Sequence, residues 1–125
     1  METYLKTFNE YQEFTKSLAV YNTVIWATTE IDSAEESLHY LYPVLALAEE
    51  AGEVAGKVAK YVRKQDTDYQ ALRAAVGKEL GDVAYQLSET ARQFGYSLQE
   101  IIDMNVEKLT DRKERGVLVG EGDNR

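Results

Sequence analysis

Apolar side chains recur every three or four residues along several stretches of this chain, which is the spacing of one face of an α-helix. The first stretch predicts a helix from residue 3 to about residue 21, with Thr3 as a weak N-cap. Its apolar positions are Leu5, Phe8, Tyr11, Phe14, Leu18 and Tyr21. From Asn22 to Asp32 β-branched and polar residues interrupt the pattern, so we expect a loop there.

Ser33 and Glu36 have the spacing of a capping box, which predicts the start of a short helix. We expect this helix to end near Tyr42, because Pro43 disfavours helical geometry in the residue before it. A second, longer helix should run from about Pro43 to Arg63, since proline fits the first turn of a helix. Its apolar stripe comprises Val44, Leu47, Ala48, Ala51, Val54, Ala55, Val58 and Val62.

Asp68 is a suitable N-cap for a third helix, which we expect from about Tyr69 to Phe94. Gly95 fits as its C-terminal stop, because glycine readily adopts the left-handed conformation that often ends a helix. The apolar stripe of this helix comprises Leu72, Val76, Leu80, Val83, Ala84, Leu87, Ala91 and Phe94.

A second capping box, formed by Ser97 and Glu100, predicts a fourth helix that continues to about Arg115. We therefore expect an all-α fold, a four-to-five-helix bundle, in a single domain over residues 1–116. Residues 117–125 contain glycine and charged residues, and we expect them to form a flexible C-terminal tail.

The composition is that of a soluble globular protein, with 44% hydrophobic and 29% charged residues among 125. The net charge of −8 gives no electrostatic basis for binding a nucleic acid polymer. There is no cysteine, which excludes disulfides, and no apolar run approaches the ~20 residues that span a bilayer. We expect no membrane association and a cytoplasmic location.

Acidic side chains gather at two places with helical spacing. Glu50 and Glu53 share a face of the second expected helix, and Glu79 and Asp82 share a face of the third. At about 100° per residue, both pairs fall on the same flank of their apolar stripes. If the two helices pack antiparallel, as a short connection favours, the four carboxylates converge at the edge of the core. Like charges repel at this spacing unless a cation lies between them, which points to a divalent metal site.

Carboxylate oxygens of this kind select Mg²⁺ or Mn²⁺. The alternative is a solvated acidic face, which is common on the helices of a highly charged protein. Glycines also recur in step on the two helices, at Gly52, Gly56, Gly77 and Gly81. They indicate close helix approach, room for a ligand, or ordinary packing of small residues.

The acidic pairs belong to two longer motifs. The first is Glu49-Glu50-Ala51-Gly52-Glu53, and the second, after 25 intervening residues, is Glu79-Leu80-Gly81-Asp82. Together they resemble the EExxE…ExxD signature of the MazG-like, all-α nucleoside triphosphate pyrophosphohydrolases. The late segment Asn105-Val106-Glu107-Lys108-Leu109 with Arg112 is also similar to that family, so the resemblance covers about residues 40 to 116. The compact form is similar to stand-alone phage and bacterial members.

The resemblance implies Mg²⁺-dependent hydrolysis of an NTP or dNTP to the monophosphate and pyrophosphate, with Mn²⁺ as a substitute. It implies that Glu50, Glu53, Glu79 and Asp82 bind the metal. Glu49 would be an outer member of the catalytic set that orients water or a ligand. The resemblance also favours purine substrates such as dGTP or GTP, and the host cytoplasm if the chain is phage-encoded.

Substrate contacts can be assigned to two further groups of residues. Candidate phosphate-binding residues are Lys57, Lys60, Asn105, Lys108 and Arg112. The two lysines share a flank of the second helix with Glu53, and the other three lie on one face of the fourth helix. Aromatic rings can stack on a base and amides can contact its edges, although each such residue also fits a core or surface role. Candidate base-binding residues are Gln12, Asn22, Trp26 and Tyr40.

Two other functions remain open at this point. A non-catalytic helical protein could bind a basic partner through its acidic face, or a pyrophosphohydrolase could act on an alarmone or another non-NTP nucleotide. The apolar stripes also exceed what one short bundle buries, and in the family two subunits build each site. We therefore expect a homodimer or a homotetramer.

Overall fold

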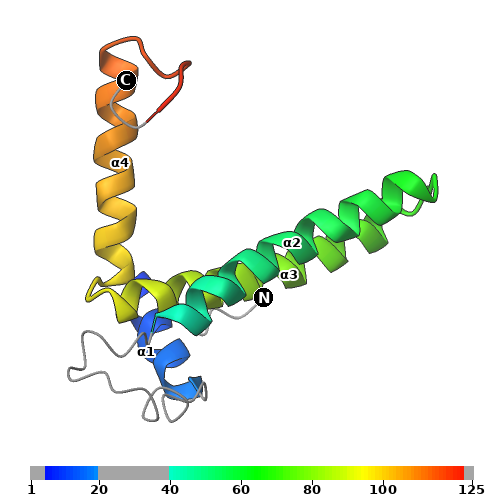
Figure 1. The fold of residues 1–125 in the computed structure, drawn as a ribbon, viewed down its shortest axis with the longest axis horizontal. Helices are drawn as coiled ribbons and strands as arrows, with labels where there is room; N and C mark the ends of the chain where they lie inside the picture. The colour runs from blue at the N-terminus through cyan, green and yellow to red at the C-terminus, as the bar shows by residue number, and fades with distance from the viewer. Residues whose placement is uncertain (1–4, 20–39, 123–125) are drawn as a thin grey trace.

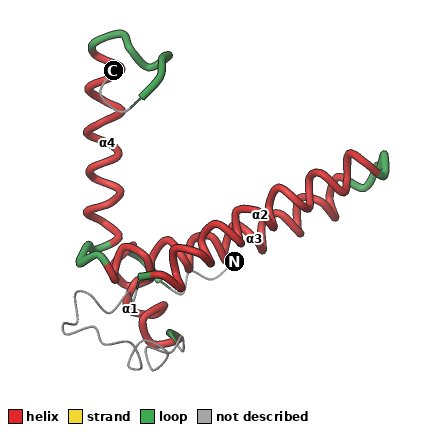
Figure 2. Tube along the Cα trace, in the orientation of Figure 1, coloured by secondary structure: helices red, strands yellow, loops and turns green. Residues whose placement is uncertain are grey.

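The computed structural model describes residues 5–19 and 40–122, which form four helices and contain no strand (Figures 1 and 2). The helices are α1 (Phe8–Leu18), α2 (Leu41–Arg63), α3 (Tyr69–Gln93) and α4 (Leu98–Glu114). The all-α prediction is confirmed. No helix in the described ranges is long and apolar enough to cross a membrane.

The two longest helices, α2 and α3, form an antiparallel hairpin (Figure 1). Asp68 ends the connection between them, and its carboxylate accepts a hydrogen bond of 3.0 Å from the backbone N–H of Ala71. The predicted N-cap of α3 is therefore confirmed. A short connection forces the antiparallel arrangement that was expected, because it leaves no length for a crossover.

Helix α1 begins at Phe8, so the predicted start near residue 3 was wrong. Thr7 and Glu10 form a capping box, in which each side chain accepts a hydrogen bond from the other's backbone N–H. The apolar spacing continues upstream through Leu5, but the cap fixes the start of the helix. The helix ends at Leu18, before the predicted end near residue 21.

Helix α2 begins at Leu41, two residues earlier than predicted, so Tyr42 lies inside it rather than at the end of a preceding helix. Pro43 still lies in the first turn, where its missing N–H is not needed, as predicted. The expected loop at 22–32 and the helix expected to begin after Ser33 lie outside the described residues.

Gly95 separates α3 from α4 and has the positive φ (79°) that was expected of a helix stop. Ser97 then caps α4 and forms the predicted capping box with Glu100. Helix α4 runs away from the α2–α3 hairpin, so the molecule has an open, angular shape (Figure 1). Residues 117–122 of the expected tail turn back toward α4, where Arg112 donates a hydrogen bond of 3.3 Å to the carbonyl of Gly122.

Helix α1 packs across the C-terminal half of α3 through polar side chains. Both amide hydrogens of Gln12 are used, because its Nε2 donates to the carbonyls of Ser88 and Tyr96 at 3.4 and 3.0 Å. Its Oε1 accepts a hydrogen bond of 3.3 Å from the backbone N–H of Leu98. Gln12 thereby joins α1, α3 and the start of α4, and this arrangement decides where α1 lies beside the hairpin.

Much of the apolar face of the hairpin is exposed. Val62 on α2 is 67% exposed and Leu80 on α3 is 52% exposed. Among the described residues, the hydrophobic core consists of Ala46, Ala91 and Leu98, which are 4–5% exposed. The periodicity predicted helices at these positions, but most of the predicted apolar stripe of α2 is exposed. This agrees with the expectation that the apolar stripes exceed what one chain buries.

The four helical glycines do not promote close packing within the described chain. A Cβ atom added at Gly52, Gly56, Gly77 or Gly81 would meet nothing within 4 Å. Close approach between α2 and α3 therefore does not explain why glycine occupies these four positions.

Candidate metal centre

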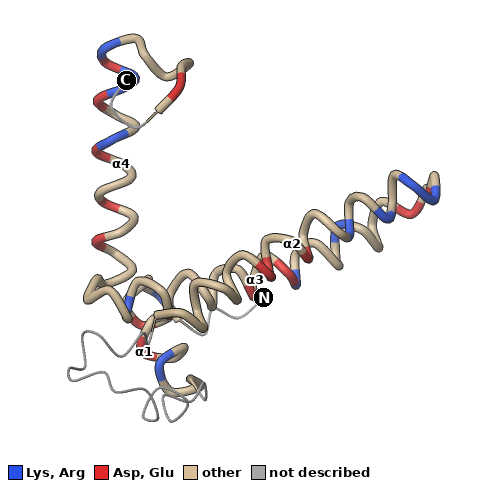
Figure 3. Tube along the Cα trace, viewed as in Figure 1, with Lys and Arg blue, Asp and Glu red and all other residues tan. Residues whose placement is uncertain are grey.

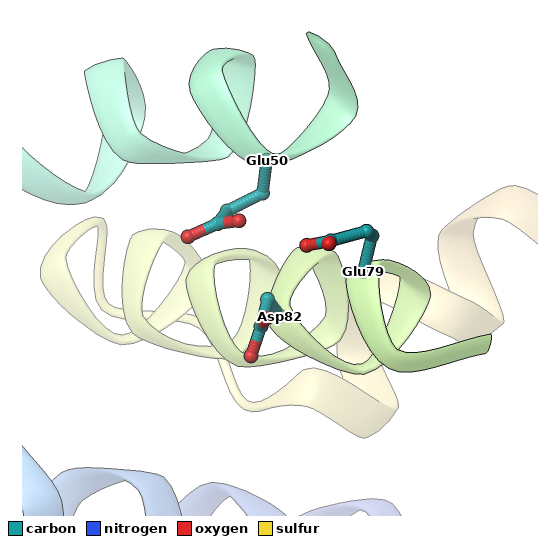
Figure 4. Close-up of side chains that lie close together, drawn as sticks. All are labelled: Glu50, Glu79 and Asp82. Atoms are coloured by element: carbon teal, nitrogen blue, oxygen red, sulfur yellow. The ribbon is translucent and has the colours of Figure 1, made fainter. Parts of the chain in front are cut away.

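Three carboxylates meet between the middle parts of α2 and α3. Ligand oxygens of Glu50, Glu79 and Asp82 all lie within 4.8 Å of one another. We call these three residues the acidic trio. Figure 4 shows Glu50 extending from α2 toward α3, where Glu79 and Asp82 lie one turn apart. The antiparallel hairpin therefore brings together both acids of the α3 pair and one acid of the α2 pair, Glu50.

The local sequence explains why these side chains share an edge. On α3 the acids are three residues apart, so they lie on neighbouring parts of one face. Glu50 and Glu79 are half-buried, whereas Asp82 is exposed. A site at the edge of the hairpin keeps its ligands accessible to solvent and still holds them on rigid helices.

The trio concentrates negative charge. Burial, and then the charges of Asp82, Glu49, Glu79 and Glu53, raise the pKa of Glu50. The ionised form of Glu50 is therefore repelled by the neighbouring carboxylates, and a bound cation would relieve this repulsion.

The geometry fits a small divalent cation. Mg²⁺ takes oxygen ligands at about 2.1 Å, so two ligands on opposite sides of the ion are about 4.2 Å apart. Only one pair among three ligands can lie on opposite sides of an octahedral ion, and adjacent ligands are about 3.0 Å apart. The oxygens of the trio, which lie within 4.8 Å of one another, must therefore move closer together, which rotation of long carboxylate side chains can supply. Three carboxylates leave further positions on an octahedral ion for water and phosphate oxygens.

Glu49 and Glu53, the other two expected members of the site, are exposed on α2 and lie outside the trio. Their charges nevertheless act on Glu50, and that of Glu53 also acts on Lys57. They belong to the electrostatic surroundings of the trio, and a direct ligand role remains a prediction.

Basic residues follow the acidic ones along the hairpin toward its tip (Figure 3). Lys57 forms an ion pair with Glu79, with 3.1 Å between Nζ and Oε1. Lys57, Lys60 and Lys64 line a groove of about 170 Å³ on the side of α2 that faces the start of α3. Of the predicted phosphate-binding residues, Lys57 therefore contacts the acidic trio and Lys60 lies in the same groove as Lys57.

The predicted phosphate-binding residues of α4 are not brought to the trio of the same chain. Asp82 lies about 16 Å before the end of α3, Lys108 lies about 15 Å beyond the start of α4, and α4 points away from the hairpin (Figure 1). Asn105 is exposed on the same helix. Arg112 is only 5% exposed, and its guanidinium group contacts Gly122.

Of the base-binding candidates, Asn22 and Trp26 lie outside the described residues. Gln12 is buried in the contact between α1, α3 and α4. Tyr40 packs against Phe94 with ring centroids 5.1 Å apart, and it lies ten residues, or about 15 Å, before Glu50 along α2. Neither described candidate is brought to the trio.

Tyr11 is a residue near the trio that the sequence did not single out. Burial and the charges of Asp82 and Tyr85 raise the pKa of its hydroxyl group. Its place in the apolar stripe of α1 predicted only a core role. No signal in the sequence could reveal this proximity, because it depends on how α1 crosses α3.

Comparisons with known proteins agree with this geometry. The family model described as the MazG nucleotide pyrophosphohydrolase domain matches residues 39–117, which include the whole hairpin and α4. Over 109 residues the chain is 37% identical to the Gene 37 protein of Mycobacterium phage L5, and the match covers 86% of this chain and 94% of that protein. No solved structure gives a significant match.

Proposed function

The chain belongs to the family of MazG nucleotide pyrophosphohydrolase domains, and from this premise we propose that it hydrolyses a nucleoside or deoxynucleoside triphosphate to the monophosphate and pyrophosphate. The observation that carries the proposal is the acidic trio, whose oxygens lie within 4.8 Å of one another between α2 and α3. Of the acidic residues in the two signature motifs, these three lie close enough together to bind one ion.

We assign Glu50, Glu79 and Asp82 as direct ligands of a divalent cation, with Mg²⁺ as the expected ion and Mn²⁺ as a substitute. Such an ion supplies charge neutralisation at phosphate oxygens and an activated water. Glu53 lies on the same helix as Glu50 and would complete the ligand set after a side-chain rotation. Glu49 would orient a water molecule from outside it.

Lys57 and Lys60 are assigned to the phosphates, because they line the groove that begins beside Glu79. Their positive charges would bind the part of the triphosphate that leaves as pyrophosphate. This placement gives the substrate a direction along the hairpin, with the terminal phosphates toward its tip. The nucleoside would then lie toward α1.

We further propose that the protein acts as a homodimer or a homotetramer. A groove of about 600 Å³, lined mainly by apolar residues of α3 with Val58 of α2, runs along the exposed side of the hairpin. A second copy of the hairpin would cover it and convert two open helix pairs into a four-helix core. Asn105, Lys108 and Arg112 could then reach the acidic trio of a partner chain.

As substrates we propose purine nucleoside triphosphates such as dGTP or GTP. The test is ³¹P NMR of reactions with Mg²⁺ and a panel of NTPs, dNTPs, alarmones and dinucleoside polyphosphates. Pyrophosphate and a monophosphate from an NTP or dNTP support the proposal. A diphosphate with free phosphate, pyrophosphate only from a non-NTP nucleotide, or no product from any compound would contradict it.

A further inference from the structure

Lys57 bridges the two helices of the hairpin at the acidic trio. Its Nζ lies 3.1 Å from Oε1 of Glu79, and the side chains of Lys57 and Glu79 are 35% and 17% exposed. Because Glu79 belongs to the acidic trio, one group expected to bind a metal is already bound to a cation of the protein. This contact places a basic residue in direct competition for a ligand of the site.

Lys57 carries a positive charge at neutral pH, as lysine does in water. A charged ammonium group offsets part of the repulsion among the carboxylates. A divalent cation beside Glu79 would repel that same group, since like charges a few ångströms apart interact unfavourably.

We propose that Lys57 is an exchangeable counter-ion: a divalent cation at the acidic trio displaces its ammonium group from Glu79, and the freed ammonium group then binds the terminal phosphates of the substrate. The first step concerns the cation alone, and the second step rests on the proposed function. Lysine suits both steps, because its charge is carried on a flexible four-carbon stem that can swing without moving the helix.

The groove beside the trio provides a place for the displaced group. Lys60 lies about one turn further along α2, and Lys64 follows at the C-cap of the helix. Ala71 and Ala75 line the same groove with small side chains, and Asp66 and Asp68 line it with carboxylates. A phosphate chain that enters from the trio would therefore meet the released Lys57 first and Lys60 next.

An ordinary surface ion pair would not have these consequences. Such pairs contribute little to stability. A pair that includes no metal ligand does not compete with a cation, so its removal should leave metal affinity unchanged. The exchange predicts instead two effects of opposite sign from one substitution. Without Lys57 the cation binds more tightly, because nothing competes for Glu79, and the nucleotide binds more weakly.

The test uses the full chain with Lys57→Met, which removes the charge and keeps the length of the side chain. Mn²⁺ affinity is measured by calorimetry in the absence of nucleotide, and KM and kcat are measured separately with an NTP. Lys60→Met is the control for metal affinity, because it removes the same charge one turn further from Glu79. Circular dichroism establishes that both variants keep their helices.

We expect Lys57→Met to bind Mn²⁺ about threefold to fivefold more tightly, which corresponds to the upper part of the energy range of exposed ion pairs. Its KM for the nucleotide should rise at saturating Mn²⁺, and Lys60→Met should change Mn²⁺ affinity less than about twofold. Unchanged or weaker Mn²⁺ binding by Lys57→Met, or equal tightening in both variants, overturns the exchange. Tighter Mn²⁺ binding with an unchanged KM overturns the second step. Because Mn²⁺ binding is measured without substrate, failure of the proposed hydrolysis would be seen separately.

Discussion

The hydroxyl group of Thr15 on α1 lies 3.2 Å from Oε2 of Glu89 on α3 and donates a hydrogen bond to it. Both side chains are fully buried. Arg92 binds the same carboxylate through two nitrogens, at 2.7 and 3.1 Å. This polar contact fixes α1 against α3, where the charge of Asp82 acts on the hydroxyl group of Tyr11.

Arg92→Met should lower the free energy of unfolding by about 2–4 kcal/mol, because it removes the cation paired with a fully buried carboxylate. The matched control is Arg115→Met, which breaks an exposed pair of the same 2.7 Å length with Asp111 and should cost under ~1 kcal/mol. Urea unfolding followed by circular dichroism measures both. Equal losses in the two variants would show that the buried network does not secure α1.

Gly56→Ala should stabilise the protein by about 0.5–1 kcal/mol, because alanine is the better helix former and its Cβ would meet nothing within 4 Å. Gly56 lies about 120° around α2 from Glu50, on the side away from the apolar stripe. Thermal unfolding measures the change. A loss of stability would mean that another chain or a ligand packs against this position.

Glu50→Gln should stabilise the metal-free protein at neutral pH. The folded protein raises the pKa of Glu50, so this group favours folding when protonated and loses that contribution as the pH rises through its folded pKa. The gain should shrink as the pH falls through the raised folded pKa of Glu50, and it should be gone below the ordinary pKa of a glutamate, about 4.3. Thermal unfolding with a chelator over a pH series measures it.

The order of stabilities should reverse when Mn²⁺ is added, because only the wild type keeps all three carboxylates of the trio. Glu107→Gln on α4 provides a control with the same change of charge. A gain of equal size in both variants would assign the effect to net charge rather than to the trio.

Light scattering should give a mass two or four times that of the chain, and a Val58→Glu/Val62→Glu double variant should be shifted toward the monomer. Val62 is 67% exposed in the single chain, and charged residues there would oppose burial against a second hairpin. A monomeric wild type would contradict the proposed assembly. An unchanged mass in the double variant would place the interface elsewhere.

Local rules predicted much of the fold. Caps at Asp68 and Ser97 and the stop at Gly95 predicted where α3 and α4 begin and where α3 ends, because these signals act within a few residues. The Thr7–Glu10 capping box was an equally readable signal that the apolar spacing obscured. Helix phase predicted that acids of two motifs would meet, and the structure brings Glu50, Glu79 and Asp82 together.

Long-range features could not be predicted in the same way. The direction of α4 depends on packing at one short turn, so the sequence could not show that α4 points away from the hairpin (Figure 1) and carries Lys108 away from Asp82 of its own chain. The pair between Lys57 and Glu79 depends on side-chain rotation across the hairpin. An apolar stripe likewise indicates a face to be covered without indicating which chain covers it.

The central claim is that the acidic trio holds the cation on which hydrolysis depends. The most direct measurement is the rate of pyrophosphate release from an NTP with Mg²⁺, compared between wild type, Asp82→Asn and Asp103→Asn. The last variant makes the same change on α4, where Asp103 contacts Gln99. We predict that Asp82→Asn loses at least about a hundredfold in rate with its helices intact, and that Asp103→Asn keeps the wild-type rate. A wild-type rate in Asp82→Asn would contradict the assignment.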